Sequence, residues 1–414
     1  MNLLYQIGIR LYGLGIHLAV PFSKKAAAWV KGRKGWRQEI LDNVPATGRF
    51  LWVHAASLGE MEQGIPVVQE LRKKYPRHKI LITFFSPSGY ENFQNEDLAD
   101  YVMYLPLDTK RNAQEFLSLF SPELALFIKY DVWLNFFRQI KLMEIPLVLA
   151  PASFREDQIY FKKPWRSLFL PVLQGVDKIL VQNSRIEQLL QNHQFTNVEV
   201  CGDTRFERAA EITQAHFISK KIEEFCEDYL IIVGGSTWPP EEDILEKTLH
   251  RYPECKVIIA PHDVSDGNVE RLQKKFQKQG AMLYSEKPQN SYRNNWVMII
   301  DTMGMLKKIY RYGHLAFVGG GFGKSIHSIV EPAAYKIPVA FGPKHHKFPE
   351  ASEMMEYGVG FEINQVRDLE KIVRDLDLHP SNRRALERKS EEYLQTKVGS
   401  TNRIIQAIEP LVIP

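Results

Sequence analysis

A short segment near residue 60 carries the residue types of a catalytic site. Residues 51–54 form an apolar run typical of a buried strand, and the small residues that follow lead to Glu60 at the start of an amphipathic helical pattern. Open α/β sheets bind their ligands outside the carboxyl ends of the strands. A carboxylate held at that edge can remove a proton from a substrate hydroxyl as a general base.

Glu60 also has a purely structural interpretation. Carboxylates are favoured in the first turn of a helix, and a helix over residues 60–75 would place Glu60 there. His54, Ser57 and Gly59, however, put polar groups and an open backbone beside the acid. These neighbours favour a site over a cap.

The composition excludes several function classes. A chain of 414 residues, with 44% hydrophobic and 25% charged residues, is typical of a globular protein with two domains. The excess of basic over acidic residues is 53 − 49 = +4, too small for a nucleic-acid-binding protein. The three cysteines, Cys201, Cys226 and Cys255, lack the spacing of metal ligands and indicate a reducing compartment. We therefore expect neither a metal nor a cofactor.

The N-terminal segment favours association with a membrane. Residues 3–22 are mostly apolar but are interrupted by Arg10, and a basic stretch follows them, the reverse of a secretory signal. A central arginine costs about 2.5–3.5 kcal/mol in a membrane-spanning helix. We expect the segment to lie along the cytoplasmic face of the membrane. A full span and an ordinary buried first helix remain alternatives.

From Phe50 onward, short apolar strands alternate with helical patterns, which is typical of a doubly wound parallel sheet. The expected strands are Phe50–His54, Ile80–Phe85, Tyr101–Leu105, Leu124–Ile128, Leu147–Ala150, Lys178–Gln182 and Val198–Gly202, and then, after a polar linker at Arg208–Asp228, Tyr229–Val233, Val257–Ala260, Val297–Ile300, Leu315–Val318 and Pro338–Phe341. This pattern predicts an α/β chain with a membrane-associating segment (1–37) and two Rossmann-like domains (38–207 and 208–414) that face a cleft.

A glycine-rich turn in the second domain predicts a nucleotide pocket. Residues 319–325 (GGGFGKS) follow a strand but do not form a P-loop, since Val318 stands where its first glycine is required. We expect a helix to start at residues 327–331, with free N–H groups for a phosphate and Glu331 for ribose hydroxyls. The loops 260–263 and 301–305 should reach the same rim. A tight structural turn is the alternative.

Seven segments together resemble the 3-deoxy-D-manno-octulosonic acid (Kdo) transferases of lipopolysaccharide synthesis. In order they read HAASLGE (54–60), TFFSPSGY (83–90), IKYDVWLNF (128–136), CGDTRFER (201–208), APHD (260–263), DTMGM (301–305) and HSIVEPAAYKIPVAFGP (327–343). The resemblance implies a GT-B fold and transfer of Kdo from CMP-Kdo to the lipid A precursor, with release of CMP, at the cytoplasmic side of the inner membrane.

The resemblance also implies roles for individual residues. Glu60 is the expected general base and Arg205 the cation that supports charge in the transition state. The expected nucleotide contacts are Pro261, His262, Met303, Gly304, Met305, Ser328, Ile329, Val330 and Glu331. The chain departs from the usual pattern at three of its positions: Lys129 replaces the first acid of an acid-x-acid pair that keeps Asp131, His262 replaces an arginine, and Ser328 replaces an asparagine.

One base and a direct displacement imply inversion at the anomeric carbon. The residues expected on the acceptor side are Ser57, Gly59, Ser86, Ser88, Gly89, Lys129, Asp131, Arg33 and Arg37, although the basic run could equally meet lipid headgroups. Two rival functions stay open: a GT-B transferase or epimerase that uses a UDP-sugar, and a membrane-bound scaffold without activity. Protection against unfolding by CMP or by UDP separates the two enzymes.

Overall fold

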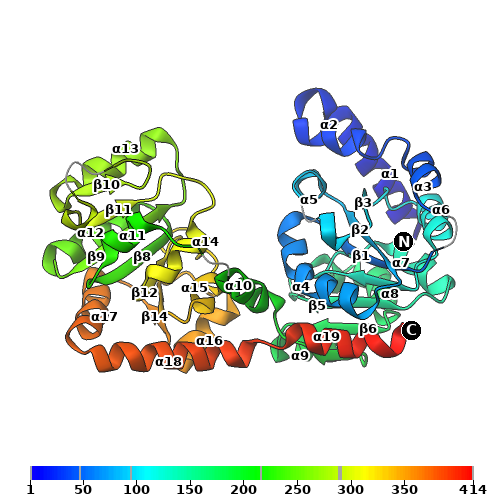
Figure 1. Ribbon diagram of the computed structural model, residues 1–414. Helices are drawn as coiled ribbons and strands as arrows, with labels where there is room; N and C mark the ends of the chain where they lie inside the picture. The colour runs from blue at the N-terminus through cyan, green and yellow to red at the C-terminus, as the bar shows by residue number, and fades with distance from the viewer. Residues whose placement is uncertain (1, 46–47, 94–95, 215–216, 288–290, 413–414) are drawn as a thin grey trace. The chain divides into compact units, whose positions relative to one another are not determined.

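The computed structural model describes residues 2–45, 48–93, 96–214, 217–287 and 291–412. The chain forms two compact units (Figure 1). The first comprises Met1–Arg208 together with Val398–Pro414, and the second comprises Ala209–Lys397. Each unit contains its own parallel sheet, so the predicted α/β class with two Rossmann-like sheets is confirmed.

The first unit is built on a seven-stranded parallel sheet. Its strands are β1 (Phe50–Ala55), β2 (Lys79–Phe84), β3 (Tyr101–Tyr104), β4 (Leu124–Phe127), β5 (Leu147–Ala152), β6 (Lys178–Val181) and β7 (Val198–Val200). Their order is β3-β2-β1-β4-β5-β6-β7, so the direction of winding reverses between β1 and β4. Such a switch point is where doubly wound sheets bind ligands. The strand that leads to Glu60 therefore lies at the expected place for a site.

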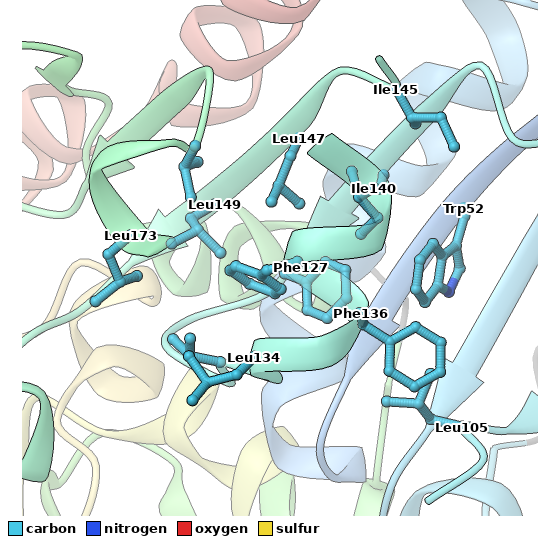
Figure 2. Close-up of a cluster of buried hydrophobic side chains, with 14 of the residues drawn as sticks. Trp52, Leu105, Phe127, Leu134, Phe136, Ile140, Ile145, Leu147, Leu149 and Leu173 are labelled. Carbon is cyan, nitrogen blue, oxygen red and sulfur yellow. The ribbon is translucent and has the colours of Figure 1, made fainter. Parts of the chain in front are cut away.

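Helices cover both faces of this sheet. They are α1 (Asn2–Ala19), α2 (Lys24–Lys31), α3 (Trp36–Asn43), α4 (Leu58–Lys74), α5 (Pro87–Tyr90), α6 (Lys110–Phe120), α7 (Leu134–Leu142), α8 (Arg166–Gln174), α9 (Ser184–Asn192) and α19 (Ser400–Ile408). Because side chains alternate along a strand, Trp52 and Phe127 pack on one face among residues of α6, α7 and α8 (Figure 2). Val53 and Leu126 pack on the other, with residues of α4 and α19.

Helix α1 has two different faces. Tyr5 and Gln6 attach it to the unit: the Tyr5 hydroxyl donates to Asp108 Oδ2 at 2.5 Å, and Gln6 Nε2 donates to Asn135 Oδ1 at 2.6 Å. Opposite them lies an exposed row of five side chains, the outer stripe, at the spacing of one helix face: Leu4, Ile7, Leu11, Leu14 and Leu18. Leu3–Phe22 is long and apolar enough to cross a membrane by length and composition.

The second unit also contains a seven-stranded parallel sheet, in the order β10-β11-β9-β8-β12-β13-β14. Its strands are β8 (Leu230–Thr237), β9 (Cys255–Pro261), β10 (Ala281–Leu283), β11 (Val297–Ile299), β12 (Leu315–Val318), β13 (Val339–Phe341) and β14 (Gly360–Glu362). Its helices are α11 (Lys220–Cys226), α12 (Pro239–Arg251), α13 (Asp266–Lys275), α14 (Leu306–Ile309), α15 (Val330–Ala334), α16 (Pro349–Tyr357), α17 (Val366–Leu378) and α18 (Pro380–Lys397). The sequence did not predict β10 and β14.

The segment 208–228, expected as a polar linker, is largely helical. Helix α10 (Thr204–Gln214) runs through the boundary between the two units, and α11 follows it. Ile222 and Phe225 of α11 are fully buried. The boundary lies where the linker was expected, but the segment is not merely polar, because these apolar residues, spaced for one face of a helix, pack into a core.

The end of the chain returns to the first unit. The expected second domain ran to residue 414, but the structure groups the chain from Val398 onward with the first unit. Ile404 and Ile408 of α19 (red in Figure 1) are fully buried in the core that contains Val53. Glu207 accepts hydrogen bonds from the backbone N–H of Thr401, at 2.9 and 3.2 Å, and so fixes the start of this helix.

Candidate active site

Glu60 stands in the first turn of α4, directly after β1. Ser57 precedes the helix in an extended conformation, and within the described chain its side chain makes no capping hydrogen bond. A Cβ atom added at Gly59 would meet none of the described atoms within 4 Å. The turn before Glu60 is therefore open, as a site requires.

The Glu60 carboxyl is partly desolvated. Its Oε2 atom is buried and has no hydrogen-bond partner among the residues that the structure describes. Burial raises the pKa of Glu60, and the charge of Asp131 raises it further, while Lys129 and the backbone N–H of Ala56 act in the opposite direction. A carboxylate with a raised pKa and an unused oxygen is suited to accept a proton near neutral pH.

Lys129 and Asp131 come from the loop after β4, the neighbour of β1 at the switch point. Lys129 has φ = 67°, a left-handed conformation that is uncommon for residues other than glycine. Burial lowers the pKa of Lys129, and the nearby charge of Glu60 raises it. The two charges thus neighbour one another.

A chain of hydrogen bonds holds Asp131. Its Oδ2 atom lies 2.9 Å from Nε2 of His54 and 2.9 Å from Nε1 of Trp133. On the other side of the imidazole, His54 Nδ1 lies 2.8 Å from Oγ1 of Thr83, which also accepts from Trp52 Nε1 at 2.8 Å. His54 is fully buried. Asp131 is therefore fixed from the sheet itself.

Arg205 belongs to the same charge cluster. Its charge lowers the pKa of Lys129, which places the two cations near one another. Thr204 starts α10, and its buried hydroxyl donates to the backbone oxygen of Gln63 in α4 at 2.6 Å. The structure thus brings together Glu60, Lys129 and Arg205, which lie far apart in the sequence.

The other acceptor-side candidates have local structural roles. Ser86 and Ser88 lie at the start of α5, their hydroxyl oxygens 2.7 Å apart. Gly89 is required by packing, because a Cβ atom there would approach the Phe84 ring to 2.2 Å. Binding of an acceptor by these residues stays a prediction.

Both arginines of the basic run are already engaged. The Arg33 guanidinium donates to the backbone oxygens of Phe85 at 2.7 Å and Leu105 at 2.8 Å, and lies 3.9 Å from the centre of the Trp29 ring. Burial lowers its pKa to about 9, so it is charged at neutral pH. Arg37 pairs with Glu115. Binding of the acceptor's phosphates by Arg33 and Arg37 stays a prediction, and it is not favoured because both guanidinium groups already have protein partners.

In the second unit, the glycine turn differs from its prediction. The backbone N–H of Gly320 donates to Glu241 Oε1 at 2.8 Å, and that of Phe322 also bonds this buried carboxylate. Helix α15 begins only at Val330 and is five residues long. Glu241, a side chain not predicted from the sequence, therefore occupies the N–H groups of the glycine turn, and phosphate binding at the start of α15 stays a prediction.

Three rings meet where β8, β9 and β12 end. His262 stacks on Trp238, with centroids 4.5 Å apart, and on His327, at 4.8 Å. Trp238 Nε1 donates to His327 Nε2 at 3.2 Å. His262 is exposed, so a planar ligand can reach it. Sequence analysis missed Trp238, although a tryptophan between a strand and Pro-Pro was a signal.

The remaining nucleotide candidates divide by exposure. Met303 is 83% exposed, and Gly304 has φ = 79°. Ser328 donates to Glu331. Three candidates are buried and can offer only backbone atoms to a ligand: Pro261, Ile329 and Val330. Met305 directly precedes α14. The described residues contain no group of three or more His, Cys, Asp or Glu able to hold a metal ion.

Comparison with known proteins finds similarity to one family. Residues 30–208, which include Glu60 and Arg205, match the family described as 3-deoxy-D-manno-octulosonic-acid transferase (kdotransferase). Curated proteins named 3-deoxy-D-manno-octulosonic acid transferase are similar to this chain in *Haemophilus influenzae* (27% identical; 87% of this chain, 86% of the relative) and *Aquifex aeolicus* (28%; 77% and 83%). A third such protein, from Chlamydia trachomatis, is 25% identical, and the match covers 86% of this chain and 84% of the relative.

Solved structures support the fold. The UDP-GlcNAc 2-epimerase from *Neisseria meningitidis* has a TM-score of 0.61 at 16% identity and covers 87% of this chain and 98% of its own. MurG from *Acinetobacter baumannii* has a TM-score of 0.54 at 13% identity, covering 87% and 99%. The fold is GT-B, as predicted, and within it residues 30–208 are similar to the Kdo transferases.

Proposed function

We propose that this protein transfers Kdo from CMP-Kdo to the lipid A precursor, lipid IVA, and releases CMP. The observation that carries the catalytic part is the half-buried Glu60 carboxyl, which follows β1 inside the segment that matches the family. Its buried Oε2 atom has no hydrogen-bond partner among the described residues. Curated relatives over more than three quarters of the chain bear the same transferase name.

In this mechanism Glu60 removes the proton from the attacking hydroxyl of the acceptor. A bond forms between that oxygen and the anomeric carbon of Kdo, while the bond from this carbon to the phosphate oxygen of CMP breaks and its electron pair leaves with CMP. The transition state is oxocarbenium-like, and a direct displacement inverts the anomeric centre. Proton removal by a placed base contributes about 10²- to 10⁴-fold.

The second unit supplies the nucleotide contacts. His262 is exposed beside Trp238, on which it stacks, and Glu331 offers a carboxylate near the turn that follows β12. Arg205, in the first unit, would support the negative charge that develops on the leaving phosphate. No metal enters this scheme, since cationic side chains and backbone N–H groups can stabilise a single phosphate.

Helix α1 would attach the enzyme to the cytoplasmic face of the inner membrane. Its outer stripe is exposed, and the segment before Glu39 contains seven Lys and Arg residues and no Asp or Glu. Apolar side chains on one helix face, with cations beside them, suit the interface of an anionic membrane. The hydrogen bonds of Tyr5 and Gln6 to the folded unit support a helix that lies on the membrane rather than crossing it.

The direct test is incubation of the purified protein with CMP-Kdo and lipid IVA, followed by mass spectrometry of the lipid. We expect a gain of one or more Kdo units and an equal yield of CMP. A UDP-sugar enzyme of the same fold would instead be protected against unfolding by UDP and not by CMP. An unmodified lipid, with no CMP released, would reject the proposal.

A further inference from the structure

His54 is a buried imidazole with a hydrogen-bond partner at each ring nitrogen. Nε2 faces Asp131 Oδ2 at 2.9 Å, and Nδ1 faces Thr83 Oγ1 at 2.8 Å. Its ring lies in the sheet, with Phe127 of the neighbouring strand 4.8 Å away between ring centres. A side chain held on all sides in this way has one orientation.

The donors of this chain can be assigned from chemistry. An ionised carboxylate only accepts, so the Nε2–H of His54 donates to Asp131. An indole only donates, so Trp52 gives its Nε1–H to Thr83 Oγ1, and the Thr83 hydroxyl can then donate to Nδ1 of a neutral imidazole. In this neutral tautomer, every hydrogen bond of the chain points toward Asp131.

Asp131 receives a second N–H at the same oxygen, from Nε1 of Trp133 at 2.9 Å. Its position is therefore set from β1 and from its own loop together. This carboxylate is one of the charges that neighbour Glu60. The role predicted from the sequence, contact with the acceptor, does not explain why two buried or half-buried N–H groups converge on one oxygen.

We propose that His54 is a positioning residue of the catalytic centre: it holds Asp131 where the negative charge of Asp131 strengthens Glu60 as a base. The proposal rests on the proposed Kdo transfer and deepens it. Thr83 and Trp52 act one step further away, by fixing the tautomer and orientation of the imidazole. Outer hydrogen bonds of this kind fix the tautomer and orientation of functional histidines in other sites.

The charged surroundings of Glu60 set the direction of the effect. Asp131 raises the pKa of Glu60, while Lys129 and the charge that His54 carries when protonated lower it. Further out, Arg155, Asp203 and Arg205 act on Lys129, and the pKa of Tyr160 is raised by burial and by both carboxylates. When Asp131 is displaced or neutralised, the pKa of Glu60 falls. The acidic limb of kcat/KM then moves to lower pH, and the base becomes weaker.

Two substitutions of His54 separate positioning from packing. In His54→Gln the amide nitrogen can reach the place of Nε2 and still donate to Asp131. In His54→Asn it reaches only the place of Nδ1. We expect His54→Asn to lower kcat by about 10²-fold, the effect of a small misplacement in an active site, with little change in the KM for CMP-Kdo. His54→Gln should recover most of that loss.

His78 offers a matched control. It is another buried histidine of the same unit, with Nε2 3.1 Å from Glu123 Oε2. It precedes β2 and so lies at the amino-terminal ends of the strands, away from Glu60. His78→Asn removes the same kind of pair and should lower the melting temperature without moving the pH profile. If His54→Asn does not fold, Asp131→Asn takes its place, and we expect its acidic limb at lower pH.

The outcomes are distinct. Loss of kcat in His54→Asn, rescue in His54→Gln and an unchanged profile in His78→Asn support the proposal. Equal activity of the folded Asn and Gln variants, or an unshifted profile in Asp131→Asn, overturns it. Absence of Kdo transfer by the wild-type protein overturns the proposed function instead, before any variant is compared.

Discussion

Asp203 accepts two hydrogen bonds from the guanidinium of Arg205, 2.8 Å from Nε and 2.6 Å from Nη2. The backbone N–H of Arg205 also donates to Asp203, at 3.0 Å. Both guanidinium bonds end at Oδ2 of Asp203, and two charge-assisted bonds restrain a planar cation better than a single contact. Arg205 is therefore oriented before any substrate binds, which is how a group that stabilises a transition state avoids reorganisation.

Arg205→Ala should lower kcat by about 10²-fold and change the KM for CMP-Kdo much less, because preorganised charge acts mainly in the transition state. Steady-state kinetics with varied CMP-Kdo measures both constants. Arg208→Ala, on the same helix and paired with Glu62 at 3.3 Å, is the control and should keep its kcat. A change confined to KM would remove Arg205 from this role.

Glu60→Gln should reduce transfer by about 10²- to 10⁴-fold, since the amide cannot accept the proton. Melting temperature and CMP affinity should stay close to those of the wild type. Glu62→Gln is the control, because this second acid of α4 pairs with Arg208. Equal losses in both variants, or a melting temperature that falls with activity, would show that Glu60 serves the helix and not the reaction.

Lys129→Met should move the acidic limb of kcat/KM to higher pH. The Lys129 cation lowers the pKa of Glu60, so its removal raises that pKa and leaves Glu60 protonated over a wider pH range. The control is Lys141→Met, a lysine of the same unit that pairs with Asp177 at 3.7 Å. A shift to lower pH would contradict the charge arrangement.

Trp238→Ala should weaken CMP binding by about two- to tenfold, since an aromatic contact is worth about 0.5–1.5 kcal/mol and His262 loses the ring on which it stacks. Calorimetry on the full chain measures the affinity. Trp238→Phe keeps a ring but not the N–H to His327 and should bind nearly as wild type. Unchanged affinity in the alanine variant would place the nucleotide elsewhere.

Leu11 and Leu18 should contribute to membrane binding, each by about 1.5–3 kcal/mol if fully buried in lipid. We expect Leu11→Ser with Leu18→Ser to weaken binding to anionic vesicles by at least tenfold and to leave the melting temperature unchanged, because both side chains are already exposed, by 60% and 67%. Leu142→Ser, at a leucine 74% exposed in α7, is the control. Vesicle sedimentation that does not change would point to another docking surface.

The sequence predicted the sheets well because their strands are continuous apolar runs. Each strand expected for the first unit is present, with bounds within two residues of those observed. The edge strands β10 (AML) and β14 (GFE), three residues each, offer at most a very short apolar run and were missed. Local pattern identifies buried strands but carries little information about short edge strands.

The site was predicted in part. Glu60 follows β1 in the sequence itself, so its place at the sheet edge could be inferred. The hydrogen bond from Gly320 to Glu241 could not be inferred, because it joins residues 79 positions apart and depends on how β8 and β12 pair. The same holds for His54 and Asp131, 77 positions apart, whose hydrogen bond exists only once β1 and β4 lie side by side.

The return of α19 to the first unit makes that unit discontinuous in the chain, with the whole second unit inserted between its parts. During synthesis from the N-terminus, the core around Val53 stays incomplete until Ile404 and Ile408 have left the ribosome. The second unit, by contrast, is one continuous segment and can complete its fold first. The half of the enzyme that begins the chain is thus expected to be the last to finish folding.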